Sequence, residues 1–349
     1  MNPLPTASQD LIDISFPPAI DSTMLSMFDA CPQKFLMEFI LRKVPIGRSI
    51  HLHAGGCVAR ATELIRIYYY RDGLPLEECF IKTFPAYAKM WGDFQAPEKE
   101  YKDFVNCWCA VEAYFKEYPP ATDYFQPYMN TDGSPAVEFK FSVPMNISHP
   151  DTGDPLMFAG RFDMLSQPHD QKVCYVVDEK TSKSLGASWQ YQWNMRGQFF
   201  GYTRSSQACG YPAVGALVRG IAIQQTQFGF QEKLVMFTEE QLDEWWHTAH
   251  KKAGQMVQMY EISKAMYNPD SLVAQKSLHT TWTKSYGDAC SSYGGCQFMD
   301  LCTHPEPWHI YRDYERRVWN PLAHDPTEES EDRLSEMGEI SFAEFMAGA

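Results

Sequence analysis

Two aspartates and one lysine, at the ends of two neighbouring apolar segments, are the residues of this sequence best suited to metal chemistry. Asp163 follows the segment 157–162, "MFAGRF", and Asp178 follows the segment 173–177, "VCYVV". If the segments form adjacent strands, both carboxylates reach one cation, and oxygen-rich sites of that kind bind Mg²⁺ or Mn²⁺ together with phosphate oxygens. Lys180 lies two residues after Asp178, so on a strand it points to the same face. An ammonium group there can orient a metal-bound water or stabilise charge that develops on a phosphate.

Glu179, between the aspartate and the lysine, is expected to face the opposite side of the strand. Its backbone carbonyl, rather than its side chain, is therefore the metal contact that we expect from this residue. The alternative is a solvated strand end held by a salt bridge, which is the commoner meaning of an isolated Asp-x-Lys pattern. Neighbouring motifs have to decide between the two interpretations.

The next predicted helix supplies such a motif in "QFFGY". Its Gln198 and Tyr202 are four residues apart, so they lie on one helical face and can hydrogen-bond a phosphate or a catalytic carboxylate. In this order, "GRFDML", "VVDEKTS" and "QFFGY" resemble the PD-(D/E)xK nuclease superfamily, in particular its RecB-type branch. The resemblance implies a restriction-endonuclease-like α/β core and Mg²⁺- or Mn²⁺-dependent hydrolysis of DNA phosphodiester bonds. It gives Asp163 and Asp178 the role of metal ligands, Lys180 that of activating water, and Gln198 and Tyr202 that of orienting substrate or ligands.

Upstream, the sequence departs from that family. A helix of the RecB-type branch usually carries a histidine four residues after a glycine, and this chain has Ala59 there. Glu63 lies one turn further along the same face and is a candidate for the missing metal ligand. The alternative is a surface glutamate that pairs with Arg60 or Arg66. Glu138 resembles an acid found in this branch, and we expect it to be structural.

Four cysteines form a second pattern. Cys290, Cys296 and Cys302 are spaced C-x5-C-x5-C, and Cys31 precedes a proline near the start of the chain. In some RecB-type nucleases, including AddB-like and CRISPR-associated exonucleases, one early and three late cysteines hold a [4Fe–4S] cluster, although the first late gap is usually shorter. Such a clamp would close a loop of about 260 residues, worth roughly 5 kcal/mol of chain entropy, and would be structural. The alternatives are Zn²⁺, with His304 as a spare ligand, or four unrelated thiols.

Several basic and aromatic residues near the predicted site are weaker candidates for DNA contacts. The possible phosphate contacts are Arg161, Lys183, Arg196 and Arg204. The tryptophans that could stack on unpaired bases are Trp189, Trp193, Trp245 and Trp246. Aromatic residues at helical spacing more often belong to a core, so we expect the tryptophans to be buried.

The elements that must position these residues follow from periodicity. Predicted helices, each with an apolar face, run over about 22–42, 57–71, 101–118 and 188–206, and a long one starts at Thr238 with Gln241 as its capping box. Predicted strands run over 137–143, 157–165, 172–180, 213–223 and 228–237. These elements predict one α/β core with a mixed central sheet of about five strands flanked by helices, plus an Fe–S clamp that joins the N- and C-terminal regions.

We expect four regions along the chain. Residues 1–130 form an N-terminal helical region that carries the first cluster cysteine, and residues 131–265 form the nuclease core. Residues 266–320 form the C-terminal cluster region, and residues 321–349 form an acidic flexible tail. The tail holds eight acids and one arginine, so it contributes −7 of the net charge of −14.

Composition limits the possible function classes. The chain has 349 residues, of which 44% are hydrophobic, enough for a substantial core. No apolar run is long enough to span a membrane and the first residues do not resemble a secretory signal, so we expect a soluble cytoplasmic protein without disulfides or membrane partners. The excess negative charge argues against nucleic acid at first sight, but half of it lies in the tail.

The resemblance therefore predicts a DNA nuclease acting in recombination, repair or replication. By resemblance, an exonuclease acting on single-stranded DNA or duplex ends is preferred to an endonuclease, and a small stand-alone chain resembles phage-encoded members. The acidic tail is a candidate site for a protein partner, or for occupying the DNA groove. The alternative, favoured by Ala59, is a catalytically silent DNA-binding or scaffold protein that keeps the fold.

Overall fold

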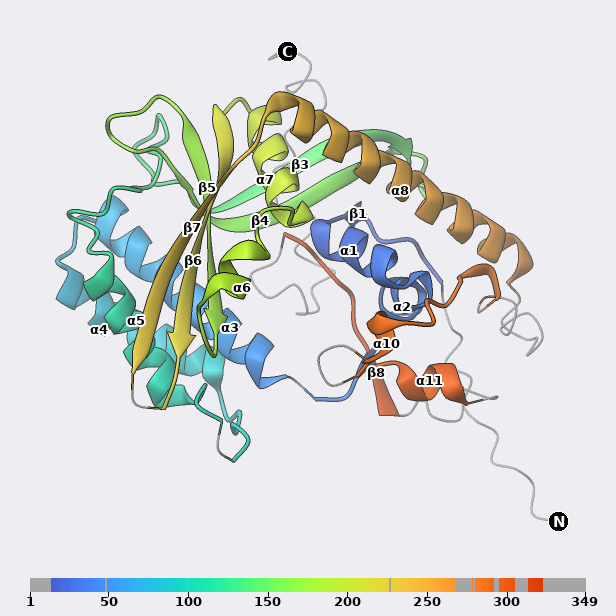
Figure 1. Ribbon diagram of the computed structural model, residues 1–349, viewed down its shortest axis with the longest axis horizontal. Helices are drawn as coiled ribbons and strands as arrows, with labels where there is room; N and C mark the ends of the chain where they lie inside the picture. The colour runs from blue at the N-terminus through green and yellow to red at the C-terminus, as the bar shows by residue number, and fades with distance from the viewer. Residues whose placement is uncertain are drawn as a thin grey trace. The chain divides into compact units, whose positions relative to one another are not determined.

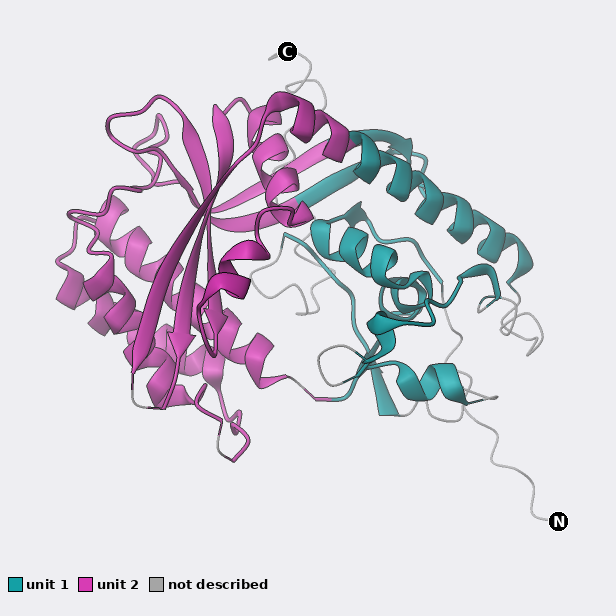
Figure 2. Cartoon of the chain, in the orientation of Figure 1, with its two compact units in different colours: residues 1–46, 144–159, 247–338 teal, residues 47–143, 160–246, 339–349 magenta. Residues whose placement is uncertain are grey.

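The computed structural model describes residues 14–47, 49–98, 100–225, 227–267, 278, 280–291, 295–304 and 313–322. The chain divides into two compact units, each built from separate stretches of sequence (Figure 2). Unit 1 contains residues 1–46, 144–159 and 247–338, and unit 2 contains residues 47–143, 160–246 and 339–349. The predicted acidic tail lies outside the described residues, apart from its first two.

A mixed six-stranded sheet is the central feature, as the sequence predicted apart from one short extra strand. Its order is β1-β4-β5-β6-β7, and β3 also pairs with β4. Strands β4 and β5, and β6 and β7, pair antiparallel, whereas β1 with β4, and β5 with β6, pair parallel. The strands are β1 (Ala19–Ile20), β3 (Val137–Ser148), β4 (Pro155–Ser166), β5 (Cys174–Ser182), β6 (Ala213–Ile223) and β7 (Phe228–Met236).

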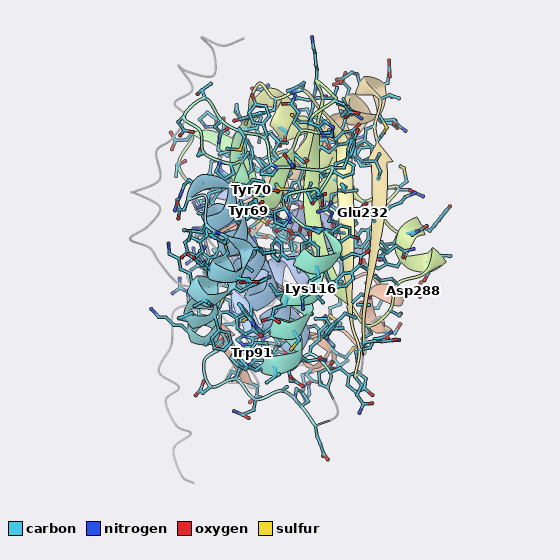
Figure 3. All side chains as sticks on the ribbon, turned by 90° about the vertical axis from the view of Figure 1, so that its left-hand side faces the viewer. Tyr69, Tyr70, Trp91, Lys116, Glu232 and Asp288 are labelled. Atoms are coloured by element: carbon cyan, nitrogen blue, oxygen red, sulfur yellow. The ribbon has the colours of Figure 1, made fainter. Side chains whose placement is uncertain are left out.

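In unit 2, helices cover both faces of the sheet (Figure 1). One face packs against α3 (Ile50–Arg66), η2 (Ile67–Arg71), α4 (Leu76–Trp91) and α5 (Phe104–Glu117). Ile221 and Ile223 of β6 belong to the core of this layer, and Figure 3 shows Trp91 and Lys116 on its helices and Glu232 on β7. The other face carries α6 (Ala187–Tyr191) and α7 (Gly197–Ala208). Alternate residues of β5 therefore face different helices.

Unit 1 contains short helices and a two-stranded sheet. Strands β2 (Lys43–Pro45) and β8 (Tyr314–Arg316) pair antiparallel. The helices are α1 (Ser22–Ala30), α2 (Pro32–Phe35), η1 (Leu36–Ile40), α10 (Asp288–Ser291) and α11 (Met299–Thr303), and the long α8 (Glu239–Met266) starts in unit 2 and ends in unit 1. Buried Trp282 donates to Ser263 at 2.8 Å and stacks on Phe35.

The predicted helix over 22–42 is wrong as a single element. Cys31 has an extended backbone, with φ −166° and ψ 110°, and Pro32 begins a new helix. Proline lacks the N–H that would continue the first helix and disfavours helical backbone in the residue before it. The predicted helix over 188–206 is also interrupted, by a run of turns without a proline between Tyr191 and Gly197.

Other boundaries agree or differ by a few residues. The helix predicted from residue 57 begins at Ile50 and passes through the Gly55-Gly56 pair, and the sequence analysis missed α4, which contains Pro85. The predicted capping box is confirmed, since Thr238 and Gln241 exchange backbone-to-side-chain hydrogen bonds of 3.0 and 3.3 Å. No helix within the described ranges combines the length and apolar character needed to cross a membrane.

Candidate active site

Strands β4 and β5 stop pairing where the two predicted aspartates lie. Their antiparallel pairing begins at Met164 opposite Val177, so Asp163 and Asp178 are the next residues of each strand and share one face of the sheet. Instead of a further pair of ladder bonds, the Asp163 carboxylate accepts the backbone N–H of Glu179 at 2.6 Å. This bond fixes the Asp163 side chain against the end of β5.

The other predicted residues gather around Asp178, which is only 4% exposed. Lys180 Nζ lies 2.5 Å from one Asp178 oxygen, and Gln198 donates to the other at 3.1 Å. The Gln198 amide also donates to the hydroxyl of Tyr202 at 3.0 Å, as the four-residue spacing on α7 allows. The structure therefore brings Asp163, Asp178, Lys180, Gln198 and Tyr202 into one connected group.

A glycine in β4 allows α7 to approach the sheet this closely. A Cβ atom on Gly160 would lie 2.7 Å from the ring of Phe141 and 3.4 Å from that of Tyr202. Any side chain at this position would push the two rings away, and with them the helix that carries Gln198. The glycine before the aspartate in "GRFDML" thus has a packing function.

The single ammonium group of Lys180 balances only one of the two aspartates. Burial raises the pKa of Asp163 well above its usual range, and the neighbouring carboxylates of Asp178, Glu179 and Glu138 raise it further. Burial also raises the pKa of Asp178, although Lys180 opposes this. Burial alone would lower the pKa of Lys180, but the two aspartates outweigh burial and raise it. Lys180 is therefore an ammonium group at neutral pH, and a further cation would relieve the repulsion that remains.

Glu179 lies on the opposite face of β5, as predicted, and joins a buried network that the sequence analysis did not find. Arg66 of α3 donates to both of its carboxylate oxygens, one at 3.1 Å, and Tyr114 of α5 donates to it at 2.8 Å. Burial would raise the pKa of Glu179, but Arg66 and these hydrogen bonds lower it to about 2. Glu179 is a permanent anion that ties β5 to both helices.

Arg219 of β6 extends this network. It donates to Tyr114 at 3.3 Å and holds Asp123 through two bonds of 2.7 Å. Arg66, Tyr114 and Arg219 also line a cavity of about 10 Å³, room for roughly one water molecule. The only sequence signal was the single charge in the strand "AVGALVRGIAI", because a charge inside an apolar strand requires a buried partner.

The two remaining candidate acids influence each other, and the charge of Glu138 also acts on Asp163. Glu63 pairs with Arg60, as in the alternative prediction, but it is 5% exposed and is therefore not the surface glutamate of that alternative. Its charge helps raise the pKa of Glu138 to about 7, after burial as the main cause. Glu138 has a φ of +52°, which is strained for a residue with a side chain, and pairs with Arg161 at 2.8 Å.

The donor set fits a divalent cation bound mainly by two carboxylates. No cluster of three or more His, Cys, Asp or Glu side chains within the described part of the chain is arranged to hold a metal ion. Asp163 and Asp178 are a pair, and the hard cations Mg²⁺ and Mn²⁺ complete such a pair with backbone carbonyl, water and phosphate oxygens. The mutual repulsion of the two buried carboxylates supports a cation at this point.

The four predicted cluster cysteines lie in unit 1 and affect one another electrostatically. Burial raises the pKa of the Cys302 thiol, and the charges of Cys296, Cys31 and Cys290 raise it further. The Cys296 N–H donates to the Cys290 carbonyl at 2.9 Å, and Gln33, two residues after Cys31, donates to the Thr283 carbonyl at 3.1 Å. Among the described residues, these four thiols do not form a cluster that could hold a metal ion.

The weaker candidates differ in their surroundings. Trp189 and Trp193 are buried, at 6% and 7% exposure, which confirms the expectation that they belong to the core. Three of the four basic candidates are ion-paired: Arg161 with Glu138, Lys183 with Glu100, and Arg204 with Glu239 and Asp243. The fourth, Arg196, is exposed, and its charge acts on both Asp178 and Lys180.

Comparison with known proteins provides no family assignment. No protein-family model and no curated protein matches the chain. A solved structure described as "Crystal structure of SSO0001" is similar to 57% of this chain and 74% of its own, with 14% sequence identity and a TM-score of 0.25. A likeness this weak carries no argument about function.

Proposed function

We propose that this chain is a divalent-metal-dependent DNA nuclease of the PD-(D/E)xK superfamily, in its RecB-type branch, with a restriction-endonuclease-like core. The observation that carries the proposal is the convergence of Asp163, Asp178 and Lys180 on one face of the sheet, where β4 and β5 stop pairing. Gln198 completes the group through its bond to Asp178. A solvated strand end would not bury Asp178 to 4% exposure or place a glutamine from a separate helix on it.

Each residue has a specific part in the proposed reaction. Asp163 and Asp178 would hold Mg²⁺ or Mn²⁺ with the backbone carbonyl of Glu179, and the ion would supply charge neutralisation and an acidified water. Lys180 positions the attacking water and stabilises charge on the phosphate, for which its ammonium form is required. Gln198 and Tyr202 fix the Asp178 carboxylate. Glu63 is assigned no direct bond to the ion, because it pairs with Arg60.

The proposed substrate is DNA, either single-stranded or at duplex ends. The proposal of an exonuclease, acting in the cytoplasm in recombination, repair or replication, comes from the resemblance of the three motifs. Lys180 pairs with Asp178, and three of the four further basic candidates pair with acids, so Arg196 is the remaining basic candidate for approach of a phosphate. Phosphate binding should therefore depend on the metal more than on a basic groove.

For the four cysteines we propose a structural [4Fe–4S] cluster, with Zn²⁺ as the alternative. Their ligand type and their common neighbourhood around Cys302 support a metal-bound clamp. Elemental analysis of the purified chain tests this. About four iron atoms per chain support the cluster and one zinc supports the alternative, whereas a chain free of both removes the clamp.

A catalytically silent DNA-binding protein is the second candidate. The observation that favours it is Ala59 in the place of the family histidine, together with a Glu63 that is paired with Arg60 and does not replace the histidine at the aspartate pair. This candidate predicts tight DNA binding without cleavage.

Cleavage of labelled DNA in Mn²⁺ or Mg²⁺ separates the two candidates. The wild-type chain should degrade single-stranded DNA or duplex ends, and Lys180→Ala should lower the rate by about 100-fold or more, the range for loss of a positioned charge. Lys183→Ala is the matched control, since this exposed lysine pairs with Glu100, and it should retain activity. Binding without cleavage by wild type, or equal cleavage by Lys180→Ala, would overturn the nuclease proposal.

A further inference from the structure

The segment between β5 and α7 presents two large apolar side chains to solvent beside the candidate active site. Tyr191 is 79% exposed and Met195 is 78% exposed, among the highest values for large apolar residues in the described chain. Single exposed apolar residues are ordinary, whereas apolar residues grouped on one surface can mark a binding site. Their position next to Arg196, which acts on Asp178 and Lys180, links them to the proposed site.

The same segment is held rigidly from below. Trp189 and Trp193 point inward, and their rings meet edge to face at 5.6 Å. Trp189 lies directly on β6, where a Cβ atom on Gly220 would be only 2.5 Å from its ring. At the other end, a Cβ atom on Gly197 would lie 3.1 Å from the indole nitrogen of Trp245. At Gly220 and Gly197 a larger residue would force the neighbouring tryptophan to move. The segment is therefore closely packed at both ends, while Tyr191 and Met195 stay exposed.

Spacing explains why two residues face outward together. Trp189 and Trp193 are four residues apart, and so are Tyr191 and Met195. Turn hydrogen bonds from Asn194 to Tyr191 and from Arg196 to Trp193, both 3.3 Å, keep the spacing nearly helical between α6 and α7. The buried side of the segment, with Trp189 and Trp193, therefore packs on the protein. The exposed side is a small apolar surface of Tyr191 and Met195, followed by the guanidinium group of Arg196.

We propose that Tyr191 and Met195 form a stacking platform for unpaired nucleobases of single-stranded DNA, with Arg196 binding the adjoining phosphate. The inference rests on the proposed nuclease function, which supplies DNA at the neighbouring carboxylates. Aromatic and thioether side chains pack on the face of any base, so they bind DNA without sequence preference. An arginine adds an ionic contact to the DNA phosphate backbone. A base-paired duplex hides its base faces within the stack, so the platform selects single strands.

The buried tryptophans cannot take this role. A base would have to displace Trp189 or Trp193 from contacts that hold α6 on the sheet. The exposed tyrosine can engage a base without any change in the fold. Substitution of Tyr191 should therefore affect binding and leave the melting temperature unchanged.

Binding of two fluorescent probes without divalent metal, so that nothing is cleaved, tests the platform. The probes are a short oligodeoxythymidine and an abasic oligomer with the same number of phosphates. Tyr191→Ala should weaken binding of oligodeoxythymidine by about 5- to 100-fold, the loss of one stacked base, and should leave binding of the abasic oligomer unchanged. Tyr191→Phe keeps the ring and should bind both probes like wild type.

Ile81→Ala is the control, because Ile81 is 75% exposed on α4, away from the proposed platform. Equal binding of oligodeoxythymidine by Tyr191→Ala and wild type overturns the inference, as does an equal loss for both probes. The assay needs no catalysis, so failure of the nuclease proposal would appear separately, as absence of Lys180-dependent cleavage. If Tyr191→Ala weakens oligodeoxythymidine binding but the wild-type chain does not cleave DNA, the protein binds single-stranded DNA and is not a nuclease.

Discussion

At the residue scale, Asp163 and Asp178 hold charge where water solvates it poorly and where each repels the other. In the metal-free protein this is a cost, because burial and repulsion raise both pKa values. A raised carboxyl pKa means that the folded state binds more protons than the unfolded state between the ordinary and the raised pKa. Stability therefore falls as pH rises through that window. Such a cost is typical of sites in which function opposes stability.

The substitution Asp163→Asn should consequently stabilise the metal-free protein at neutral pH while it abolishes cleavage. We expect a gain of about 1 kcal/mol in the free energy of unfolding, because the neutral amide removes the repulsion with Asp178. Thermal unfolding in a chelator measures it, and the gain should shrink as pH falls and Asp163 becomes protonated. Asp93→Asn, at an exposed aspartate, should show no gain. A destabilised Asp163→Asn variant would argue that the carboxylate is structural.

Lys180 shows how much a short pattern can predict. Its position two residues after Asp178 predicted a common face, and the 2.5 Å contact between Nζ and the carboxylate confirms it. Its tight pairing in the metal-free chain is what we expect of an ammonium group waiting beside two acids. In the proposed reaction, a cation held by the aspartates would leave this ammonium group to the attacking water.

At the element scale, strand β5 is held from both sides. Asp178 and Lys180 face α7. Glu179 faces α3 and α5, where Arg66 and Tyr114 bind it. A strand end that carries catalytic groups has to be rigid, since a misplacement of about 1 Å is costly to a positioned reaction. The back-face network is therefore a positioning device for Asp178 and Lys180, although none of its members meets the substrate.

Arg66→Ala should leave the buried Glu179 without its cation and lower the free energy of unfolding by about 3 to 5 kcal/mol. The pKa of Glu179 is lowered to about 2. The stability that the Arg66–Glu179 pair contributes is therefore fully present above the ordinary carboxyl pKa, and it is lost as the pH falls from there toward about 2. Urea unfolding at neutral pH measures the effect. The double variant Arg66→Met with Glu179→Gln should recover much of the loss.

Arg71→Ala is the comparison for this prediction, because Arg71 is 53% exposed and pairs only with its neighbour Asp72. It should leave the free energy of unfolding nearly unchanged, because exposed ion pairs contribute little. Arg66→Ala and Arg71→Ala variants of equal stability would contradict a buried ion pair at Glu179.

Local sequence patterns predicted the helices and strands around the site better than the side-chain contacts between them. Strand β5 and helix α7 follow from alternation and from the four-residue spacing of Gln198 and Tyr202. Helix α4 was not predicted, because its internal Pro85 is typical of a helix end. Helices α1 and α2 were predicted as one helix across Cys31 and Pro32. The sequence analysis also missed Arg66 as the partner of Glu179, because 113 residues separate the two and no local period connects them.

At the scale of the whole molecule, chain segments far apart in sequence build each unit. Strands β2 and β8 pair across 271 residues at Val44 and Glu315. In the same unit, Asp21 accepts the Trp319 indole N–H at 2.7 Å, and Gln33 bonds to Thr283. Contacts that close such long loops cost chain entropy, so a metal clamp at Cys31, Cys290, Cys296 and Cys302 has a clear physical purpose here. The shared metal at these four cysteines stays a prediction, since they form no metal-holding cluster in the described residues.

The central claim is a shared divalent ion at Asp163 and Asp178, and anomalous diffraction from crystals grown with Mn²⁺ tests it most directly. We predict an anomalous peak within bonding distance of both carboxylates, at about 2.0 to 2.2 Å, that disappears in crystals of Asp163→Asn. Crystals that bind Mn²⁺ elsewhere, or in which Asp178 stays paired with Lys180 and no peak lies between the aspartates, would contradict the account.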